Sequence, residues 1–261
     1  MLEPHASSSA PRENLHTRTT RLLARTVIES GHAAEPAFFP RELDLCRQLG
    51  VSRTVLRESM KVLVDKGMIE MKPKAGTRAR PLTEWRLLDP DILSWQAEVR
   101  PDAQFLRDLC EVRLAIEPTA AGFAAVRVSA AELKLIDACL ADREARARTA
   151  PVEELIDLDL RFHMAVVEAS RNPLLRELSR TIRQPFRTAL RCTSRFRSAV
   201  ELGLEAHKDL LAALKKRDPM GARRAAEQVV GFAMLAVEKA GRAGKAQVKR
   251  MGVDWDVRRV F

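Results

Sequence analysis

Four side chains near residue 55 have types and spacing suited to binding DNA. Arg53 and Arg57 are four residues apart, so on a helix both guanidinium groups lie on one face and can reach base edges or phosphates together. Ser52 and Thr54 can donate hydrogen bonds to a phosphate at the start of that helix, where the helix dipole favours an anion. A merely solvated charged face has the same spacing, so the neighbouring elements must decide between the two interpretations.

A second pair of side chains, Asp159 and His163, has the spacing of metal ligands. Because they are also four residues apart, a carboxylate and an imidazole would lie on one face of a helix and could bind one divalent metal ion. An ordinary ion pair on a helix surface has the same spacing. The pair alone therefore leaves both interpretations open.

Three helical segments surround the two arginines. Apolar residues recur at helical spacing over residues 15–30, 41–49 and 53–66. Gly50 breaks the chain between the second and third segments, and Ser52 is placed to cap the third helix. Two short helices joined by a turn that contains glycine are typical of a protein that reads the DNA major groove.

A basic β-hairpin follows the third helix. Residues 69–72 alternate like a strand, residues 73–76 form a turn, and residues 77–80 return. Gly76 permits close approach of the backbone to DNA, and the basic side chains flanking the turn are Lys72, Lys74 and Arg78. The hairpin resembles the wing of a winged helix-turn-helix, and it favours DNA binding over a merely solvated helix.

Length and charge agree with a DNA-binding protein of two domains. The chain has 261 residues and a formal net charge of +10 at pH 7. The basic excess lies at the ends, since residues 1–80 hold 14 Lys or Arg against 9 Asp or Glu, and residues 241–261 hold 6 against 2. Residues 1–14 lack an apolar period and are expected to be disordered.

Several classes of protein are excluded by composition. No apolar run approaches the roughly 20 residues needed to cross a bilayer, and the first 30 residues lack the apolar core of a signal peptide, so we expect a cytoplasmic, nucleoid-associated protein with no membrane partner. The four cysteines show no paired spacing, which argues against a zinc knuckle or a disulfide framework. The absence of tyrosine argues against stacking platforms for single strands and favours duplex DNA.

The chain beyond Pro81 is predicted to be helical throughout. Its apolar residues recur at a period near 3.6, and no segment has a convincing strand pattern. Prolines and polar turn residues divide this part into about six helices.

Taken together, the N-terminal motifs resemble those of the GntR family of bacterial regulators. The resemblance covers the whole N-terminal domain and implies a winged helix-turn-helix over residues 15–80 that binds double-stranded operator DNA. The matching motifs are Phe39-Pro40-Arg41-Glu42, Leu45-Cys46, the run from Gly50 to Glu58, Gly67-Met68-Ile69 and Gly76-Thr77. The DNA contacts that it implies come from Ser52, Arg53, Thr54, Arg57, Gly76 and Thr77.

The segment from Trp85 to Trp95 resembles the first helix of the effector domain in the FadR-like subgroup of this family. That domain is an antiparallel helical bundle called FCD, and the segment is most similar to the one in galactonate (sugar-acid) operon repressors. The fold class is therefore expected to be mainly α, with an N-terminal winged helix-turn-helix and a C-terminal antiparallel all-α bundle. The expected bounds are a linker over 81–88, a helical effector-binding and dimerisation domain over 89–240, and a basic tail over 241–261.

Arg113 is a candidate for binding the effector. Together with Glu117-Pro118 it resembles the bundle helix whose arginine often faces the ligand cavity. A guanidinium group can pair bidentately with a carboxylate effector. The alternative, an ion pair with Glu117 that only braces the helix, remains open.

The stretch that begins at Asp159 resembles the metal-binding helix of FCD domains, and His207 matches the next metal histidine of that family. The resemblance implies one divalent metal ion, Zn²⁺, Ni²⁺ or Mn²⁺, held by Asp159, His163 and His207, with an effector bound by these residues and Arg113. Val229 stands where the family usually has a last histidine. Three ligands leave positions open for water or an effector carboxylate. In the metal-free alternative, the two histidines and Arg113 bind a polar ligand directly.

The sequence therefore predicts a sequence-specific transcription regulator and not an enzyme. We expect a repressor released by a small carboxylate such as a galactonate-like sugar acid, and a homodimer, because two recognition helices about one DNA turn apart would read a pseudo-palindromic operator. A metal-dependent hydrolase would share the three-ligand site, but no separate general base or nucleophile motif accompanies it. A purely architectural DNA-binding protein would have no use for polar residues converging inside a bundle, which are costly to bury.

Overall fold

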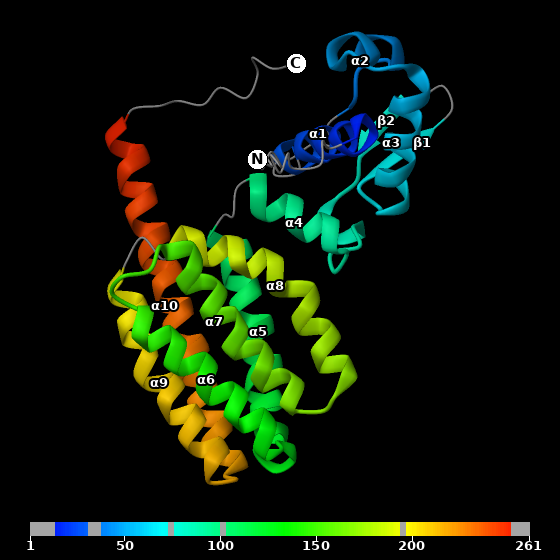
Figure 1. Cartoon of the computed structure of the whole chain (residues 1–261). Coiled ribbons are helices and arrows are strands. Elements are labelled where there is room, and N and C mark those ends of the chain that lie inside the picture. The colour runs from blue at the N-terminus through cyan, green and yellow to red at the C-terminus, as the bar shows by residue number, and fades with distance from the viewer. Residues whose placement is uncertain (1–13, 31–37, 73–75, 100–102, 194–196, 252–261) are drawn as a thin grey trace, which may run out of the picture. The chain divides into compact units, whose positions relative to one another are not determined.

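The structure, a computed structural model, divides the chain into two compact units, Met1–Val99 and Arg100–Phe261 (Figure 1). The residues that it describes are 14–30, 38–72, 76–99, 103–193 and 197–251, with the backbone alone at 103, 189–193, 197–202 and 236–251. The expected fold class is confirmed, since one small antiparallel hairpin is the only sheet in the described part of a mainly helical chain. No helix in these ranges has the length and apolar character needed to span a membrane.

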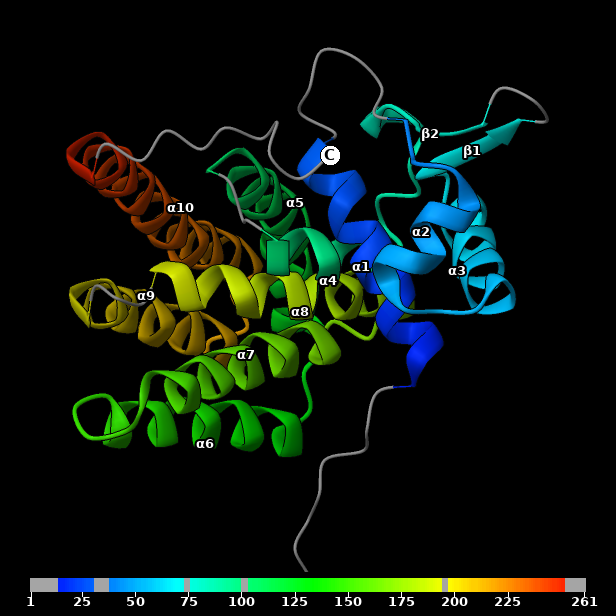
Figure 2. The same ribbon diagram turned by 90° about the horizontal axis from the view of Figure 1, so that it is seen from above.

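The first unit begins as a winged helix-turn-helix. Its first elements are α1 (Leu15–Ser30), α2 (Glu42–Leu49), α3 (Arg53–Asp65), β1 (Ile69–Lys72) and β2 (Gly76–Ala79). The two strands are antiparallel, with Ile69 opposite Ala79 and Lys72 opposite Gly76. In Figure 2, α2 and α3 lie side by side, as a helix-turn-helix requires. These bounds agree with the predicted ranges to within a residue or two.

The start of α1 corrects one expectation. Asn14 was assigned to a disordered terminus, but its side-chain Oδ1 accepts a hydrogen bond from the backbone N–H of Thr17 at 2.8 Å. Asparagine is a favoured helix cap because its side chain satisfies a backbone donor that the helix leaves without a partner. The rest of the expected disordered segment, residues 1–13, lies outside the described residues.

Two glycines fix the turns on either side of α3. Gly50 ends α2 in the left-handed conformation, with φ +65°, and its N–H bonds to the carbonyl oxygen of Cys46. Gly67 follows α3 with φ +76°, and a Cβ added there would lie 2.5 Å from the carbonyl oxygen of Glu84. A larger residue at position 67 would meet both a backbone clash and an unfavourable φ.

The first unit extends past the expected domain boundary. A 3₁₀ turn, η1 (Leu82–Glu84), and a helix, α4 (Pro90–Val99), follow the hairpin. Trp85 and Ile92 are buried in the hydrophobic core that α1 and α3 share. The predicted linker over 81–88 and the predicted start of the second domain at residue 89 are therefore wrong, because apolar side chains from both segments complete the core of the first unit.

Lys66 joins the end of α3 to α4. Its ammonium group lies 2.7 Å from Asp89 Oδ1 and 2.8 Å from Asp91 Oδ2, and it stands 5.6 Å from the centre of the Trp95 ring. Burial alone would lower the pKa of Lys66, but hydrogen bonds and charge from the two aspartates outweigh it and raise the pKa. The charged Lys66 side chain therefore links the end of α3 to α4 through two ion pairs.

The second unit is a helical bundle. In the described part of the chain its helices are α5 (Ala103–Arg127), α6 (Ala130–Arg146), α7 (Val152–Ala169), α8 (Pro173–Thr193), α9 (Arg197–Lys215) and α10 (Pro219–Met251). Consecutive helices run in opposite directions, and α5 lies in the middle, packed against α7, α8, α9 and α10 (Figures 1 and 2). This central position brings side chains of α5 close to those of most other helices.

Polar caps set where the helices of the second unit begin. Ser129 and Glu132 form a reciprocal capping box at the start of α6. Asn172 Oδ1 accepts hydrogen bonds from two backbone N–H groups of α8, and Asp218 Oδ1 does the same at α10. Polar turn residues were predicted to divide this part of the chain, and these three caps have that role.

The last helix corrects another expected boundary. The bundle was predicted to end at residue 240, and a basic tail was predicted to follow over 241–261. The backbone of α10 instead continues to Met251. A glycine inside a helix costs only about 1 kcal/mol relative to alanine, so the surrounding Ala, Lys, Arg and Gln residues can carry the helix through it.

Candidate functional site

The first candidate site is the outer face of α3. Ser52 caps the helix, and its Oγ accepts a hydrogen bond from the backbone N–H of Val55 at 3.3 Å. Arg53, Thr54 and Arg57 are exposed, and the arginine side chains keep 60% and 56% of their surface accessible. The opposite face of α3 is buried in the core of the unit. The structure thus presents the four predicted residues of the recognition helix together on an open face.

Both arginines bond to one carboxylate that the sequence analysis did not single out. Arg53 Nε donates to Glu42 Oε1 at 2.9 Å, while Arg57 donates from Nε to Oε1 at 3.0 Å and from Nη2 to Oε2 at 3.1 Å. The hydrogen bonds from Arg53 and Arg57 lower the pKa of Glu42, which stays ionised. The partners are eleven and fifteen residues apart, so the contact depends on how α2 crosses α3 and gives no local signal in the sequence.

The predicted wing residues lie at the start of β2. Gly76 is exposed and has φ +86°, a backbone conformation that favours glycine. Thr77 is partly buried, and its carbonyl oxygen accepts a hydrogen bond from the N–H of Phe39. Lys74 lies outside the described residues. The wing therefore offers an open backbone at Gly76, whereas Thr77 also holds the strand in place.

The other basic side chains of the wing share an acidic partner. Lys72 Nζ lies 3.2 Å from Glu70 Oε2, and Arg78 pairs with the same carboxylate. Both basic side chains remain more than two-fifths exposed.

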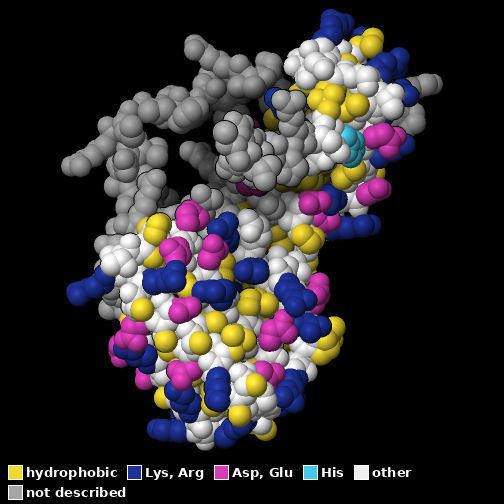
Figure 3. All heavy atoms as spheres, in the orientation of Figure 1, with side chains coloured by type: hydrophobic (Ala, Val, Ile, Leu, Met, Phe, Trp, Pro, Cys, Tyr) yellow, Lys and Arg dark blue, Asp and Glu magenta, His cyan; other side chains and the backbone are white. Residues whose placement is uncertain are grey.

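The surface of the second unit has a mixed charge. On its visible face, basic and acidic side chains alternate without a patch of one sign (Figure 3).

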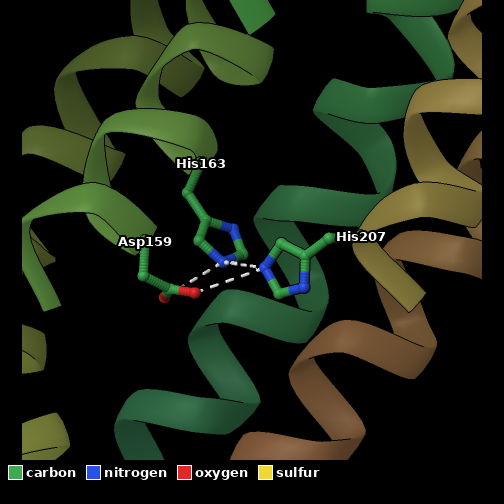
Figure 4. Close-up of side chains that lie close together, drawn as sticks. All are labelled: Asp159, His163 and His207. Atoms are coloured by element: carbon green, nitrogen blue, oxygen red, sulfur yellow. Dashed lines mark hydrogen bonds and ion pairs between the residues drawn. The ribbon is translucent and has the colours of Figure 1, made fainter. Parts of the chain in front are cut away.

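The second candidate site lies inside the helical bundle. Asp159 and His163 from α7 meet His207 from α9 (Figure 4). The two Nε2 atoms are 3.3 Å apart, His163 Nε2 lies 3.4 Å from Asp159 Oδ2, and His207 Nε2 lies 3.3 Å from Asp159 Oδ1. The structure thus brings the three predicted metal ligands together, from helices that are far apart in the sequence.

The outer nitrogen of each histidine is held by a hydrogen-bond acceptor. His163 Nδ1 donates to Glu117 Oε2 at 2.9 Å, and His207 Nδ1 donates to the carbonyl oxygen of Gly203. With both Nδ1 atoms acting as donors, the two Nε2 atoms face each other. Two lone pairs at this distance repel, so a proton or a cation between them would stabilise the arrangement. Arg113 Nη2 also lies 3.4 Å from His163 Nε2.

Charges from neighbouring helices set the protonation of His163 and Glu117. Burial alone would raise the pKa of Glu117, but the charges of Arg113 and His163 outweigh it and lower the pKa to about 2. Burial would likewise lower the pKa of His163, but Glu117 and Asp159 raise it to about 9. Without a metal ion, His163 is therefore protonated at neutral pH.

Arg143 also affects the pKa values of the other two candidate ligands, Asp159 and His207. Burial alone would raise the pKa of Asp159, yet Arg143 and His163 hold it well below its usual value. Arg143 Nη2 lies 3.2 Å from Asp159 Oδ1. Burial, with the nearby charges of Arg143 and His163, lowers the pKa of His207. The cluster therefore contains an ionised carboxylate and one neutral imidazole, both of which can act as ligands.

These three residues fit a divalent metal ion. A tetrahedral ion with ligand distances of about 2.0–2.2 Å has ligand atoms about 3.3–3.6 Å apart. The two Nε2 atoms are 3.3 Å apart, and each lies 3.3 to 3.4 Å from one of the two oxygens of Asp159. Both Nε2 atoms face the shared position, and the acceptors at Nδ1 are the kind of outer partner that metal-binding histidines usually have. Binding requires His163 to give up its proton. A metal ion bound there would supply open coordination positions for oxygen ligands.

Arg113 of α5 lies next to this cluster and is 1% exposed. Its Nε and Nη2 donate to the two oxygens of Glu117 at 2.5 and 3.1 Å, and its guanidinium lies 3.5 Å from the centre of the Phe186 ring. Nη1 is buried and has no hydrogen-bond partner among the described residues. The ion pair with Glu117 is thus formed, and one edge of the guanidinium remains available for a ligand.

A cavity next to Arg113 contains a second buried donor. Ser179 of α8 is 7% exposed, and its Oγ also has no hydrogen-bond partner within the described ranges. The cavity has about 20 Å³ of space for the centres of water-sized molecules, within about 320 Å³ of empty space that includes its opening to solvent. Its lining includes Arg113, Glu117, His163, Ser179, Ile182 and Phe186. A buried donor without a partner is costly, so two of them at one cavity point to a ligand that accepts hydrogen bonds.

Val229 of α10 shares a second cavity with His163. It is 4% exposed and lines this smaller cavity together with His163 and Glu117. The position that carries a histidine in many FCD domains therefore lies beside the predicted metal ligands. An isopropyl group cannot bind a metal ion, so this chain offers three ligands where the resemblance gives four.

Three residues of this site were not identified from the sequence as members of the site. Glu117 was considered only as a brace for Arg113, although its spacing was a usable signal. Arg143 falls on the buried face of α6, which a helical plot of Ile136, Cys139 and Leu140 would have shown. Ser179 carries no signal of this kind, because a single serine in an amphipathic helix is ordinary.

Comparisons with known proteins identify the families to which the two parts of the chain are similar. Residues 21–78 match the family described as bacterial regulatory proteins, gntR family, and residues 108–232 match the FCD domain. The galactonate operon transcriptional repressor of Escherichia coli (strain K12) is 33% identical over 188 residues, covering 72% of this chain and 81% of that protein. The Uxu operon transcriptional regulator of the same strain is 28% identical over 230 residues, covering 84% and 83%.

A solved structure also has the same fold. The Listeria monocytogenes protein Lar, described as controlling the expression of the agr system, superposes with a TM-score of 0.61 at 16% identity, covering 88% of this chain and 99% of that one. The two matched families and these relatives are transcription regulators rather than enzymes. The chain therefore belongs to the GntR family of bacterial regulatory proteins, with an FCD domain after its DNA-binding domain.

Proposed function

We propose that this chain is a transcriptional repressor that leaves its operator when a small carboxylate binds inside the second unit. The proposed DNA contacts are those of the exposed recognition helix and wing: Ser52, Arg53, Thr54, Arg57, Gly76 and Thr77. A homodimer would place two such helices about one DNA turn apart on a pseudo-palindromic operator. Because its target is chromosomal DNA, we propose a cytoplasmic, nucleoid-associated location.

The observation that carries the effector proposal is the free edge of Arg113. A carboxylate in the cavity would accept a hydrogen bond from Arg113 Nη1 and a second from Ser179 Oγ, which satisfies both buried donors at once. Binding of this kind leaves the ion pair between Arg113 and Glu117 in place. The arginine would therefore both brace α5 and bind the effector.

We propose that Asp159, His163 and His207 hold one divalent metal ion next to this carboxylate. The 3.3 Å separation of the two Nε2 atoms, the nearby carboxylate of Asp159 and the outer acceptors of both histidines support the proposal. With Val229 in place of a fourth protein ligand, more than one coordination position is left for effector oxygens or water. In the metal-free alternative, His163 would keep its proton, and the two histidines and Arg113 would form hydrogen bonds to the effector directly.

A sugar acid is the first effector class to test, because the similar repressor and regulator named above belong to the galactonate and Uxu operons. We propose that the effector shifts a dimer toward a domain arrangement in which its two recognition helices no longer match the half-site spacing. The free energy for this shift comes from tighter binding of the effector to that arrangement.

The test is release of operator DNA. The purified protein is first used to select a duplex from a random library, and binding of this duplex is then titrated with a panel of sugar acids and simpler carboxylates, with and without prior chelation. Wild type is expected to release the duplex with at least one acid. Release that disappears after chelation supports the metal centre, whereas release that survives supports direct binding by the histidines.

Two variants locate the effector. Arg113→Met and Ser179→Ala should retain DNA binding and require at least tenfold more acid for release, because each removes a buried donor. Thr181→Ala is the matched control, since it deletes a hydroxyl of the same helix that bonds to the backbone carbonyl of Glu177. If both cavity variants respond like the control, the effector binds elsewhere. If no duplex is selected at all, the proposal of operator binding fails.

A further inference from the structure

Glu42 holds a pair of arginines that point out from the recognition helix. As the first residue of α2 it accepts three hydrogen bonds, one from Arg53 and two from Arg57, at 2.9 to 3.1 Å. The bond pattern to Arg57 is bidentate, with Nε and Nη2 facing the two carboxylate oxygens. Such a pair fixes the plane of the guanidinium as well as its position.

The edges that these bonds leave free are the edges that recognise bases. Arg57 uses Nε and one N–H of Nη2 for Glu42, so its outer edge, formed by Nη1 and Nη2, stays available. Arg53 uses Nε alone, so both of its terminal nitrogens stay available. A guanidinium edge with two parallel N–H groups matches the O6 and N7 atoms of guanine in the major groove.

A structural role in the fold does not account for this cluster. The side chains of Arg53 and Arg57 are 60% and 56% exposed, and ion pairs at this exposure contribute little to stability because water screens them. A carboxylate on a surface that must approach phosphates also opposes non-specific binding to DNA. The placement of Glu42 therefore has a cost for DNA affinity, which a role in orienting the arginines would offset.

We propose that Glu42 is a positioning residue that sets the sequence specificity of DNA binding by holding Arg53 and Arg57 in the geometry for reading bases. This inference rests on the proposed DNA contacts of the two arginines and names the residue that regulates them. Without the carboxylate, each arginine side chain loses conformational entropy when it binds its base, which weakens operator binding. The side chain can also contact a phosphate instead of the base. Binding to the operator then weakens while binding to other sequences does not.

The experiment compares two substitutions that remove one negative charge each. Glu42→Gln keeps the size of the side chain and removes the charge that orients the arginines. Glu58→Gln is the matched control, because Glu58 lies on α3 itself and pairs with Lys61 only through an exposed ion pair. Fluorescence anisotropy at one salt concentration measures the Kd for the selected operator and for a scrambled duplex, and thermal unfolding confirms that both variants fold.

The expected result is a change in the ratio of the two Kd values. Glu42→Gln should lower the specificity ratio about tenfold through weaker operator binding, with scrambled DNA bound as tightly as by wild type or more tightly. Glu58→Gln should leave the ratio within about twofold of wild type. In a background with both Arg53→Ala and Arg57→Ala, the substitution at Glu42 should have no further effect on the ratio.

Three results separate failure of this inference from failure of the proposed contacts. If Glu42→Gln leaves the ratio unchanged while the arginine variants lower it, Glu42 does not position them. If Glu42→Gln relaxes specificity at a base pair that neither arginine variant affects, Glu42 reads a base itself, which also overturns the inference. If the arginine variants bind operator like wild type, the proposed DNA contacts fail and this inference fails with them.

Discussion

Replacement of Glu117 by Gln should destabilise the second unit through the buried charge that it leaves behind. Glu117 pairs with Arg113, which is 1% exposed, and it accepts a hydrogen bond from His163 Nδ1. Glutamine keeps the size of the side chain and an oxygen that can accept that hydrogen bond. The loss therefore reports the missing negative charge next to a buried guanidinium.

Two independent routes give a similar magnitude. Breaking a buried ion pair by removing one partner costs about 3–5 kcal/mol. The pKa of Glu117 lies at about 2 in the folded protein against 4.5 for the ordinary side chain, and at about 1.4 kcal/mol per pH unit this difference corresponds to about 3 kcal/mol of stability. We therefore expect Glu117→Gln to lower the free energy of unfolding by about 3 kcal/mol at pH 7.

The pH dependence has a definite sign. Because the pKa is lower in the folded state, the ionised carboxylate stabilises the fold above about pH 4.5, and this contribution is lost as the pH falls toward about 2. The difference between wild type and Glu117→Gln should therefore be largest near neutral pH and shrink through this range. Differential scanning calorimetry with a chelator present, at a series of pH values, measures it without a contribution from bound metal.

Controls separate the buried charge from a general effect of lost carboxylates. Asp157→Asn removes an exposed carboxylate of α7 that pairs with Arg187, and it should cost less than about 1 kcal/mol. The double variant with Arg113→Met and Glu117→Gln should be more stable than Glu117→Gln alone, because no buried guanidinium remains without a partner. A loss below about 1 kcal/mol for Glu117→Gln at pH 7, or one independent of pH, would refute this reasoning.

Four further substitutions test other parts of the structure. Arg53→Ala and Arg57→Ala should each weaken operator binding about tenfold or more in a mobility-shift titration. If both variants bind the operator as tightly as wild type, α3 is not the recognition helix. Val229→His should raise zinc affinity at least tenfold in a calorimetric titration by supplying a fourth ligand, and unchanged affinity would mean that the side chain does not reach the metal position. Gly67→Ala should lower the free energy of unfolding by more than about 1 kcal/mol in urea, because its Cβ meets the Glu84 carbonyl, and a neutral result would contradict this packing.

Local signals in the sequence predicted most of the secondary structure. The ranges of α1, α2, α3 and the hairpin followed from apolar periodicity and from the positions of Gly50 and Ser52, which act on their immediate neighbours. The boundary between the units could not be found in this way. Burial of Trp85 and Ile92 depends on packing against α1 and α3, and their local sequence is equally consistent with the start of the next domain.

The candidate site shows the same division between local and tertiary information. Spacing of four residues identified Asp159 with His163 and Arg113 with Glu117, since both pairs lie within single helices. The approach of His207 from α9 came from a family resemblance, and its 3.3 Å separation from His163 appears only in the folded bundle. Ser179 and Glu42 could not be singled out, because their significance lies in partners, or in missing partners, that are set by helix packing.

The contacts between α3 and α4 determine where the chain can be divided into fragments or joined to another domain. A fragment that ends at Arg80, or a chimera joined within residues 81–88, would remove Trp85 and α4 from the core and break the contacts of Lys66 with Asp89 and Asp91. A fragment that ends at Val99 keeps all of these. The fusion point for exchanging one effector domain for another, in engineering or in gene recombination, therefore lies after α4 and not before it.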